Sequence, residues 1–320
     1  MKSIIPFVFG LLLAGSAWAQ GYPSRPVKVI VPWPPGQATD IAARVVAERL
    51  QVALGQGFVI DNRPGAGGAI GSDAAVKSSP DGYTLLAASS GPLSIMPNLQ
   101  KVPYDPLKDL APISLVAAVP FALVTHPSFP AANAREFVAL VKANPGKYTF
   151  ASSGTGATAH LFAELFNSMA QLQARHVPYK GTAPAITDII NGQVSYAVET
   201  VAATVNHVKS GRLKTYGVST TRRAGAMPDA PTLAEAAGLP DYNAAAWIGY
   251  AAPAGTPREI LERVSGEIRK ALDSQELKDR FISLGLDPVS STPDEMASFM
   301  RREQERYATI IRDANIKLEQ

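Results

Sequence analysis

Residues 27–40 read VKVIVPWPPGQATD, in which an apolar run, Val27–Val31, leads into a loop rich in Pro and Gly. Apolar residues with helical spacing follow from Ile41, so this region predicts a strand, a tight loop and a helix. The first N–H groups of a helix lack partners within it, and the helix dipole places partial positive charge at the same end. The loop therefore suits an anion such as a carboxylate. It contains no Cys, no Ser–His pair and no metal-ligand spacing, which indicates binding without chemical change.

The composition is that of an ordered globular protein. The 320 residues are enough for one large or two medium domains. Hydrophobic residues make up 46% and charged residues 18%, a balance that excludes intrinsic disorder. Because 30 Lys and Arg oppose 27 Asp and Glu, the net charge is +3. This small charge, without a dense basic run, argues against a nucleic-acid partner.

The N-terminal residues have the three parts of a secretory signal peptide. Lys2 supplies the positive charge, Ile4–Gly15 is an apolar stretch too short to span a bilayer, and Ala17-Trp18-Ala19 is a small-x-small cleavage site. We expect residues 1–19 to be removed and the mature protein, which starts at Gln20, to be free in the periplasm. The alternative is an N-terminal membrane anchor. The chain has no Cys, which excludes disulfides, thiolate catalysis and a lipidated N-terminal Cys.

Segments typical of strands and of helices alternate along the rest of the chain. We expect strands at 27–31, 58–61, 83–88, 148–151, 174–177, 194–198, 213–218 and 247–251, with one or two extended segments in 113–125. We expect helices at 39–54, from the loop at 63–68 through 76, and at 134–143, 158–172 and 182–191, followed by a helical C-terminal third with capping boxes at Thr256–Glu259 and Thr292–Glu295. This alternation predicts an α/β fold with largely parallel sheets.

Two glycine-rich loops resemble nucleotide-binding motifs in part. Ser152–Ala159 fits the G-x-G-x-x-A pattern between a strand and a helix. The acidic residue that a dinucleotide fold places about 20 positions further on is missing from 173–176. Gly65–Gly71 has Ile70 in place of the third Gly, and neither loop ends in Gly-Lys-Ser/Thr. We therefore expect no nucleotide cofactor, although the same geometry remains suited to a carboxylate.

The His residues do not form a recognisable metal site. His160 and Glu164 lie four apart on one predicted helix, but zinc needs three or four ligands, so an ordinary polar pair is the better interpretation. The three other His residues are isolated in the sequence and are predicted to be structural: His126, His176 and His207. We expect neither a metal nor any other cofactor.

A hydrolase would need a nucleophile with a base. The hydroxyls at 89–90 and 152–153 have no His or Asp paired with them in the sequence, and Gly154-Thr155-Gly156 is not a Gly-x-Ser-x-Gly elbow. Trp33 and Trp247 could stack on a ligand or fill the core.

A series of motifs resembles those of the extracytoplasmic solute receptors of the tripartite tricarboxylate transporter family, the Bug receptors. The resemblance extends from about Tyr22 to the C-terminus and rests on motifs in a fixed order: Pro32–Arg44, Asn62–Gly68, Pro80–Leu85, Gly154–Leu161, Val177–Gly181, Pro184-Ala185, Gly192–Val194, Trp247 and Ala252–Pro257. One such motif would be a weak signal, whereas this many in order are highly specific.

The resemblance implies an α/β, two-lobed periplasmic binding protein of the Venus flytrap type, with a mostly parallel sheet flanked by helices in each lobe. Lobe one would comprise 22–124 and 226–320, and lobe two 125–225. A ligand would lie between the lobes at the carboxyl ends of the strands, held by backbone N–H groups and ordered waters. The implied ligand-binding residues are Trp33, Pro35, Gly36, Gln37, Ala38, Thr39, Ser89, Ser90, Ser152, Ser153, Gly154, Thr155, Thr158, Tyr179, Gly181, Thr182 and Glu199.

Two parts of the sequence depart from the family pattern. The first loop usually reads Pro-Gly-Gly-Ser-Thr-Asp, whereas Gln37 and Ala38 stand here at its third and fourth positions. Gln37 could change the pocket or point into solvent. Glu199 lies near a position that faces the cleft in relatives, where it would repel a second negative group on the ligand and favour a neutral or amine-bearing end. Asp40 is predicted to stabilise the helix dipole rather than to contact a ligand.

The resemblance implies a monomeric receptor, not an enzyme, that binds a small carboxylate-bearing molecule and delivers it to membrane permease subunits. Di- and tricarboxylates, amino acids and aromatic acids all fit a carboxylate held by the backbone. A receptor that reports to a sensor kinase of a two-component system would have the same fold and pocket. An extracytoplasmic hydrolase is the less favoured alternative.

Overall fold

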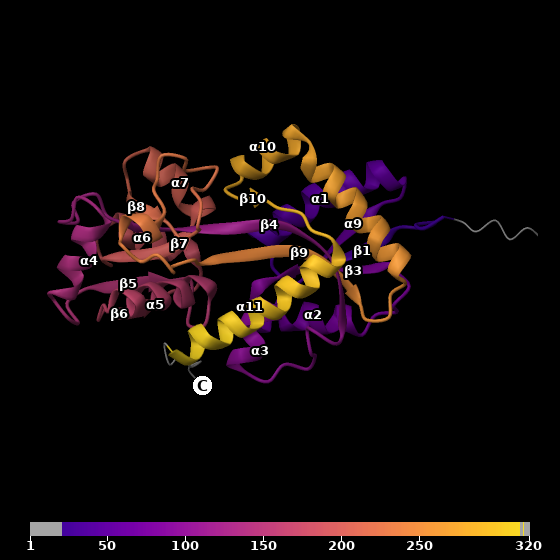
Figure 1. Ribbon diagram of the computed structural model, residues 1–320, viewed down its shortest axis with the longest axis horizontal. Helices are drawn as coiled ribbons and strands as arrows, with labels where there is room; N and C mark the ends of the chain where they lie inside the picture. The colour runs from indigo at the N-terminus through magenta and orange to yellow at the C-terminus, as the bar shows by residue number, and fades with distance from the viewer. Residues whose placement is uncertain (1–20, 314–315, 317–320) are drawn as a thin grey trace, which may run out of the picture.

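The computed structural model describes residues 21–313 and residue 316, so the predicted signal peptide at 1–19 lies outside the described residues. Strands and helices alternate in an α/β fold (Figure 1). The strands are β1 Val27–Val31, β2 Phe58–Asn62, β3 Thr84–Ser89, β4 Leu110–Thr125, β5 Thr149–Ser152, β6 Arg175–Pro178, β7 Tyr196–Thr200, β8 Lys214–Val218, β9 Ala245–Pro253 and β10 Asp287–Pro288. The helices are α1 Ala38–Leu54, η1 Ala66–Gly68, α2 Ala69–Val76, η2 Gly91–Ile95, α3 Met96–Leu99, α4 Ala134–Lys142, α5 Thr158–Ala170, α6 Thr182–Ile190, α7 Val201–Lys209, α8 Leu233–Ala236, α9 Arg258–Asp273, α10 Gln275–Ser283 and α11 Pro293–Asp313.

Two sets of parallel strands lie at the two ends of one sheet, whose order is β2-β1-β3-β9-β4-β7-β5-β6. The first set is β2, β1 and β3, and the second is β7, β5 and β6. The long strands β4 and β9 join the sets by antiparallel pairing, and β8 and β10 also pair antiparallel with β4. The sheet is therefore mixed, whereas the sequence predicts largely parallel sheets, because two strands cross between the sets (Figure 1).

The register makes the carboxyl ends of the two parallel sets face each other. β3 runs in the direction of β4, and its last residue, Ser89, is level with Ile248 of β9 and so with Ala117 of β4. β7 runs in the opposite direction, and its last residue, Thr200, pairs with Phe121 of β4. The four steps from Ala117 to Phe121 correspond to ~13 Å along a strand. Loops that leave the two sets of strand ends therefore project toward the same region.

Burial explains where the first strand and helix form. Every residue of β1 except Lys28 is buried, as expected for a strand covered on both faces. α1 buries a stripe that includes Ala42, Val46 and Leu50, the helical spacing of the sequence. The helix ends at Gly55, whose φ of +71° suits glycine and whose N–H bonds to the carbonyl of Gln51.

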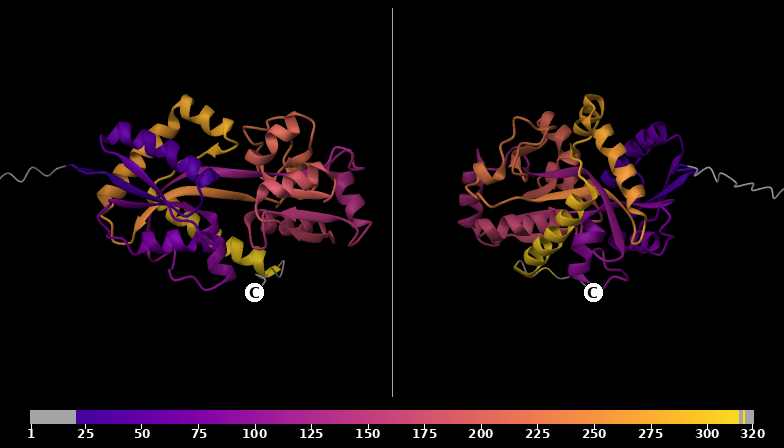
Figure 2. Two further views of the ribbon diagram at one scale, coloured as in Figure 1. Left: turned by 180° about the vertical axis from the view of Figure 1, so that it is seen from behind. Right: turned by 45° about the vertical axis from the view of Figure 1, so that its right-hand side comes forward.

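Helix α11 connects the two ends of the molecule through side-chain packing. It lies along β4 and reaches α5, and Figures 1 and 2 show it crossing the sheet obliquely. Its Tyr307 stacks on Phe162 of α5 with ring centroids 6.1 Å apart. Arg306 donates to the carbonyl of Asn243, just before β9. The two ends are therefore joined by this helix as well as by β4 and β9.

The capping boxes are confirmed at one of the two predicted helix starts. The Thr292 hydroxyl accepts from the Glu295 N–H, and the Glu295 carboxylate accepts from the Thr292 N–H. At the other start, the Thr256 hydroxyl donates to the carbonyl of Pro253, and Pro257 occupies the N-cap position of α9. The reason is that α9 begins one residue later than predicted, with Pro257 as its N-cap, so the Thr256 side chain closes the preceding turn.

The segment 226–244, which the sequence assigns to lobe one, packs against elements near the other end of the sheet. Its helix α8 contacts β8 and α4. The Val218 N–H at the end of β8 donates to the carbonyl of Pro231. The chain then returns along β9 from Ala245.

Candidate functional site

Among the helices that start on the facing strand edges, α1, α5 and α6 lack a side-chain cap from their N-cap residues, which are Gln37, Ala157 and Gly181. In contrast, α4, α7, α8 and α10 each begin with a side chain that accepts from an N–H of the first turn. The first N–H groups of α1, α5 and α6 have no partner within the helix. They are therefore able to bind an anion.

The loop before α1 is held by the Asp40 carboxylate, which is 2% exposed. It accepts from the Gly36 N–H at 2.8 Å, from the Asn62 amide at 2.8 Å and from the Arg44 guanidinium at 3.0 Å. Burial alone would raise the pKa of Asp40, but the hydrogen bonds from these groups outweigh it and hold the pKa below its ordinary value. Asp40 thus shapes the loop from within, and the Gly36 N–H is already engaged.

Trp33 joins this loop to the end of β3. Its indole Nε1 donates to the Ser89 hydroxyl at 2.9 Å, and its ring packs so closely that a Cβ on Gly91 would lie 2.7 Å from it. Trp33 is half-buried. Trp247, in contrast, is buried in the core and packs edge-on against Phe299 with centroids 5.8 Å apart. Of the two tryptophans, Trp33 therefore belongs to the candidate site and Trp247 to the core.

The loop before α5 is held by two His residues. The Ser152 hydroxyl lies 2.6 Å from His176 Nε2, and the Gly156 N–H donates to His160 Nδ1 at 3.1 Å. The two imidazoles stack with centroids 3.9 Å apart. His176 is isolated in the sequence, but pairing of β5 with β6 brings it beside Ser152, 24 positions away, where it has the structural role that was predicted.

This Ser–His pair was not recognised in the sequence, yet it does not form a nucleophile. Ser152 is buried, and its hydroxyl also donates to the carbonyl of Gly154 and accepts from the Gly154 N–H. A nucleophilic hydroxyl has to reach its substrate, whereas this one is enclosed within its own loop.

The turn after β6 is pinned to the same loop. The Tyr179 N–H donates to the carbonyl of Ser152, and the Gly181 N–H donates to that of Ser153. The Tyr179 phenol donates to Asp188 at 2.7 Å, and burial together with this carboxylate raises the pKa of Tyr179 to about 12. The phenol is therefore committed to α6 as a neutral donor.

Glu199 is the second-last residue of β7 and is 1% exposed. Its carboxylate accepts from the Thr200 N–H at 3.1 Å. Burial raises its pKa to about 7, although the Thr200 N–H and the Thr182 hydroxyl act in the opposite direction. Its charge state therefore changes in the physiological pH range.

The implied ligand-binding residues fall into two groups on the facing edges. One group lies at or after the ends of β1 and β3, namely Trp33, Pro35, Gly36, Gln37, Ala38, Thr39, Ser89 and Ser90. The other lies at or after the ends of β5 and β6 or near the end of β7, namely Ser152, Ser153, Gly154, Thr155, Thr158, Tyr179, Gly181, Thr182 and Glu199. Gln37 is exposed. Sequence reasoning missed the supporting roles of Asn62, His160 and His176. A signal existed for His160, four residues after Gly156, whereas Asn62 and His176 lie on β2 and β6, far in the sequence from the residues they contact.

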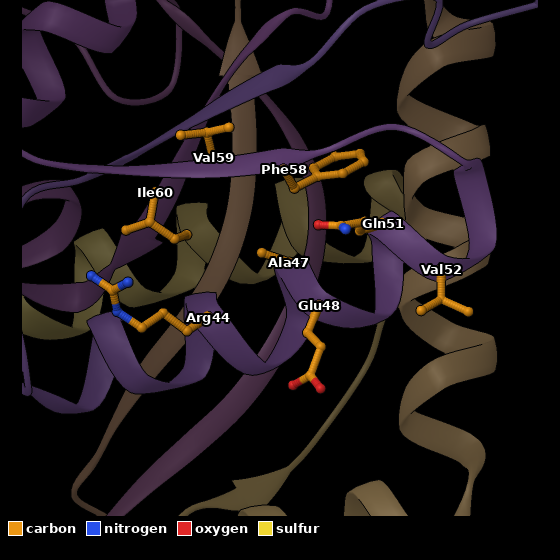
Figure 3. Close-up of a pocket in the computed structure, with 8 residues that line it drawn as sticks. All are labelled: Arg44, Ala47, Glu48, Gln51, Val52, Phe58, Val59 and Ile60. Atoms are coloured by element: carbon orange, nitrogen blue, oxygen red, sulfur yellow. The ribbon is translucent and has the colours of Figure 1, made fainter.

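Two surface hollows lie elsewhere, along the outer edge of the sheet. One, of about 500 Å³, is lined by Arg44, Ala47, Glu48, Gln51, Val52, Phe58, Val59 and Ile60 (Figure 3). A second, of about 400 Å³, is lined by Pro26, Val27, Lys28, Val59, Ile60 and Asp61. Neither shares a residue with the implied ligand site. Figure 3 shows the side chains of the first spread along α1 and β2 rather than converging on one point, so we do not assign the ligand there.

None of the helices within 21–313 has the length and apolar character needed to cross a membrane. Over the same residues, no group of three His, Asp or Glu side chains is arranged to hold a metal ion.

Comparison with known proteins identifies the family. Residues 42–316 match the model of the tripartite tricarboxylate transporter family receptor. Protein BugT of Bordetella pertussis is 40% identical, and the match covers 96% of this chain and 94% of BugT.

Solved structures agree with this assignment. R. palustris Rpa4515 with adipate is 32% identical with a TM-score of 0.82, covering 92% of this chain and 99% of that one. MatC from Rhodopseudomonas palustris with bound malate is 30% identical with a TM-score of 0.77, covering 91% and 100%. The two-lobed fold is thus confirmed. The chain belongs to the receptor family of the tripartite tricarboxylate transporters, among the Bug-type periplasmic substrate-binding proteins.

Proposed function

We propose that this protein is a periplasmic receptor that binds a small carboxylate between its two lobes. The observation that carries the proposal is the pair of facing strand edges, from which α1 and α5 start without side-chain caps. Each helix start offers N–H donors and partial positive charge to a carboxylate. The proposed lobes are 22–124 with 226–320, and 125–225. The packing of α8 favours moving the second boundary toward Ala245.

The ligand class follows from the chemistry of the edges and from the relatives. Backbone N–H groups recognise a carboxylate whatever the rest of the molecule is. The two similar structures hold adipate and malate, which supports small dicarboxylates, while tricarboxylates, amino acids and aromatic acids remain compatible. We propose that the monomeric receptor delivers its ligand to the permease subunits of a tripartite transporter, after export by a cleaved signal peptide. It would need no cofactor and catalyse no reaction.

A thermal-shift screen tests this proposal. The mature protein, residues 20–320, would be unfolded and refolded to remove any carried-over ligand, and then heated with succinate, malate, adipate, citrate, glutamate or benzoate. An acid present at ~100 times its dissociation constant adds ~2.7 kcal/mol of stability, enough to raise Tm by a few degrees. The amide of the best acid, which lacks the carboxylate charge, is the control. A flat response to all six acids would contradict the proposal.

Glu199 is expected to select against a second negative charge. If its carboxylate faces the cleft, Glu199→Gln should improve binding of succinate or adipate relative to benzoate about tenfold at pH 8, or ~1.4 kcal/mol. That is well within the ~4 kcal/mol by which unit charges 4 Å apart repel at an effective dielectric constant of about 20. At pH 5.5, below the pKa of about 7, the wild-type carboxyl is mostly neutral and the advantage should shrink. An unchanged ratio at pH 8 would reject this role.

The same substitution should change the pH dependence of stability. The pKa of Glu199 is about 7 in the folded protein and about 4.5 in the unfolded chain, so the folded state binds more protons between these values. Wild-type stability therefore falls as pH rises through this window, by up to ~3 kcal/mol. Glu199→Gln should not show this loss. Its Tm advantage should grow by a few degrees between pH 4.5 and pH 8, and a constant difference would contradict the buried-carboxyl assignment.

A further inference from the structure

We propose that His160 and His176 are positioning residues that hold the loop 152–158 in the geometry that binds the carboxylate. This inference rests on the proposed function, since it assigns how one edge of that site is kept in place. Neither imidazole is among the residues implied to touch the ligand.

The two imidazoles secure both ends of the loop at once. His176 Nε2 lies 2.6 Å from the hydroxyl of Ser152, where β5 ends, and His160 Nδ1 accepts from the N–H of Gly156 at 3.1 Å. His160 is 6% exposed and lies in the first turn of α5. The two rings stack on each other with centroids 3.9 Å apart, so each imidazole packs against the other.

The two imidazole rings are themselves held in place by packing against Phe150. The His176 ring stacks on Phe150 of β5 with centroids 4.9 Å apart, and that of His160 stacks on the same ring at 6.1 Å. Phe150 is buried and also packs against the ring of Tyr196 in β7. The two imidazoles therefore anchor the loop 152–158 to buried side chains of the sheet rather than to solvent-exposed residues.

The hydrogen bond from Gly156 fixes the proton of His160. A ring nitrogen that accepts an N–H cannot carry a proton, so the neutral ring is protonated at Nε2. That nitrogen lies 3.6 Å from the carboxylate of Glu164, one turn further along α5. Each imidazole thus has the other as an ionisable neighbour. Two further ionisable groups lie nearby, namely Glu164 on α5 and Tyr196, which packs against Phe150. Burial and His160 lower the pKa of His176 to about 4, so this ring is neutral at pH 7.

The loop 152–158 needs these hydrogen bonds because its glycine residues can adopt several backbone conformations. Gly154 has a φ of +135° and Gly156 a φ of +77°, conformations that glycine adopts freely but does not enforce. Ordering flexible residues upon binding lowers affinity, whereas a loop that is already ordered avoids that loss. The stacked pair therefore preorganises the N–H groups at the start of α5.

Isosteric substitutions separate this role from a general effect on folding. The amide of Asn can place an acceptor where His160 has Nδ1, and the amide of Gln can place a polar atom where His176 has Nε2. We expect His160→Leu to weaken binding of the best acid in the six-compound panel about tenfold, and His160→Asn to restore it to within about threefold of wild type. His176→Leu and His176→Gln should behave in the same way. Both variants at each position lose the stacked ring, so their Tm values should fall together while their affinities separate.

Phe166→Leu is the matched control, because Phe166 is buried on α5 and its contacts are with core rings. It should lower Tm without a tenfold loss of affinity. If His160→Leu binds like wild type, or if His160→Asn binds as weakly as His160→Leu, the inference is wrong while the proposed function stands. If wild type binds none of the six acids, it is the proposed function that fails.

A measurement without any ligand keeps the inference testable in that case. Amide hydrogen exchange of Gly156 should be slow in wild type and at least tenfold faster in His160→Leu, with His160→Asn close to wild type. Equal exchange in wild type and His160→Leu would overturn the inference by itself.

Discussion

Ala38→Pro should weaken binding of the best acid in the panel by about 10- to 100-fold while leaving the fold intact. Ala38 is the first residue of α1, the position where Pro is tolerated in helices. The preceding Gln37 has φ −77° and ψ 160°, which is the conformation that a residue before Pro prefers. The substitution therefore removes one N–H donor from the proposed carboxylate site with little strain. A hydrogen bond to a charged group contributes ~1.5–3 kcal/mol, which gives the expected range.

The control for this prediction is Gln275→Pro, at the first position of α10. Its N-cap residue, Ser274, has φ −69° and ψ 137°, so the backbone is equally compatible with Pro. Calorimetry should find unchanged affinity in this variant. If Ala38→Pro binds as tightly as wild type, the N-terminus of α1 does not hold the carboxylate.

Gly285→Ala should prevent the two lobes from closing and lower affinity about 30-fold or more. Gly285 lies between α10 and β10, with a φ of +74°. A Cβ at this position would lie 2.5 Å from Cα and 2.6 Å from N of Ala202, in the first turn of α7. These are backbone atoms, so the two segments have to separate. A receptor whose closed form is rarely populated binds more weakly by the same factor.

The contact is extended by neighbouring residues. The Gly225 N–H donates to the Asp287 carboxylate at 3.0 Å, and a Cβ on Gly225 would lie 2.9 Å from Ile282 of α10. Burial raises the pKa of Asp287, although the hydrogen bond from Gly225 lowers it. The α10–β10 turn thus fits against the proposed second lobe over several residues, which is why one methyl group should have a large effect.

The matched control is Gly55→Ala, since Gly55 has a φ of +71° and open space where a Cβ would lie. It carries the same backbone strain, ~1–2 kcal/mol, without the clash. Small-angle scattering with saturating acid should show a larger radius of gyration for Gly285→Ala than for wild type or Gly55→Ala. If Gly285→Ala compacts normally, the contact does not control closure.

The sequence predicts much of this fold because its strong signals are local. The run Val27–Val31, the helix start near Thr39 and the Thr292 capping box depend on neighbours in the chain, and each is found where predicted. The antiparallel crossing of β4 and β9 was missed because pairing between distant strands leaves no local period in the sequence. The second capping box was wrong for a different reason, since α9 begins one residue later than predicted and Pro257 is its N-cap.

The loops of the candidate site could be predicted from the sequence, whereas the side chains that hold these loops in place could not. Glycine and proline patterns mark the segments that carry free N–H groups, and the resemblance to known receptors placed both loops. The network around Asp40 depends on Asn62, which comes from the neighbouring strand. The stacked pair requires His176 to lie beside His160, a pairing set by strand order rather than by spacing. Such contacts become visible only once the sheet is assembled.

A crystal structure of the mature protein with its best-binding acid tests the central claim most directly. The account predicts one carboxylate between the facing strand edges, within hydrogen-bond distance of N–H groups at the starts of α1 and α5. The account would be contradicted if the acid were bound in the surface hollow between α1 and β2 (Figure 3). It would also be contradicted if the acid were held by side chains away from both helix starts.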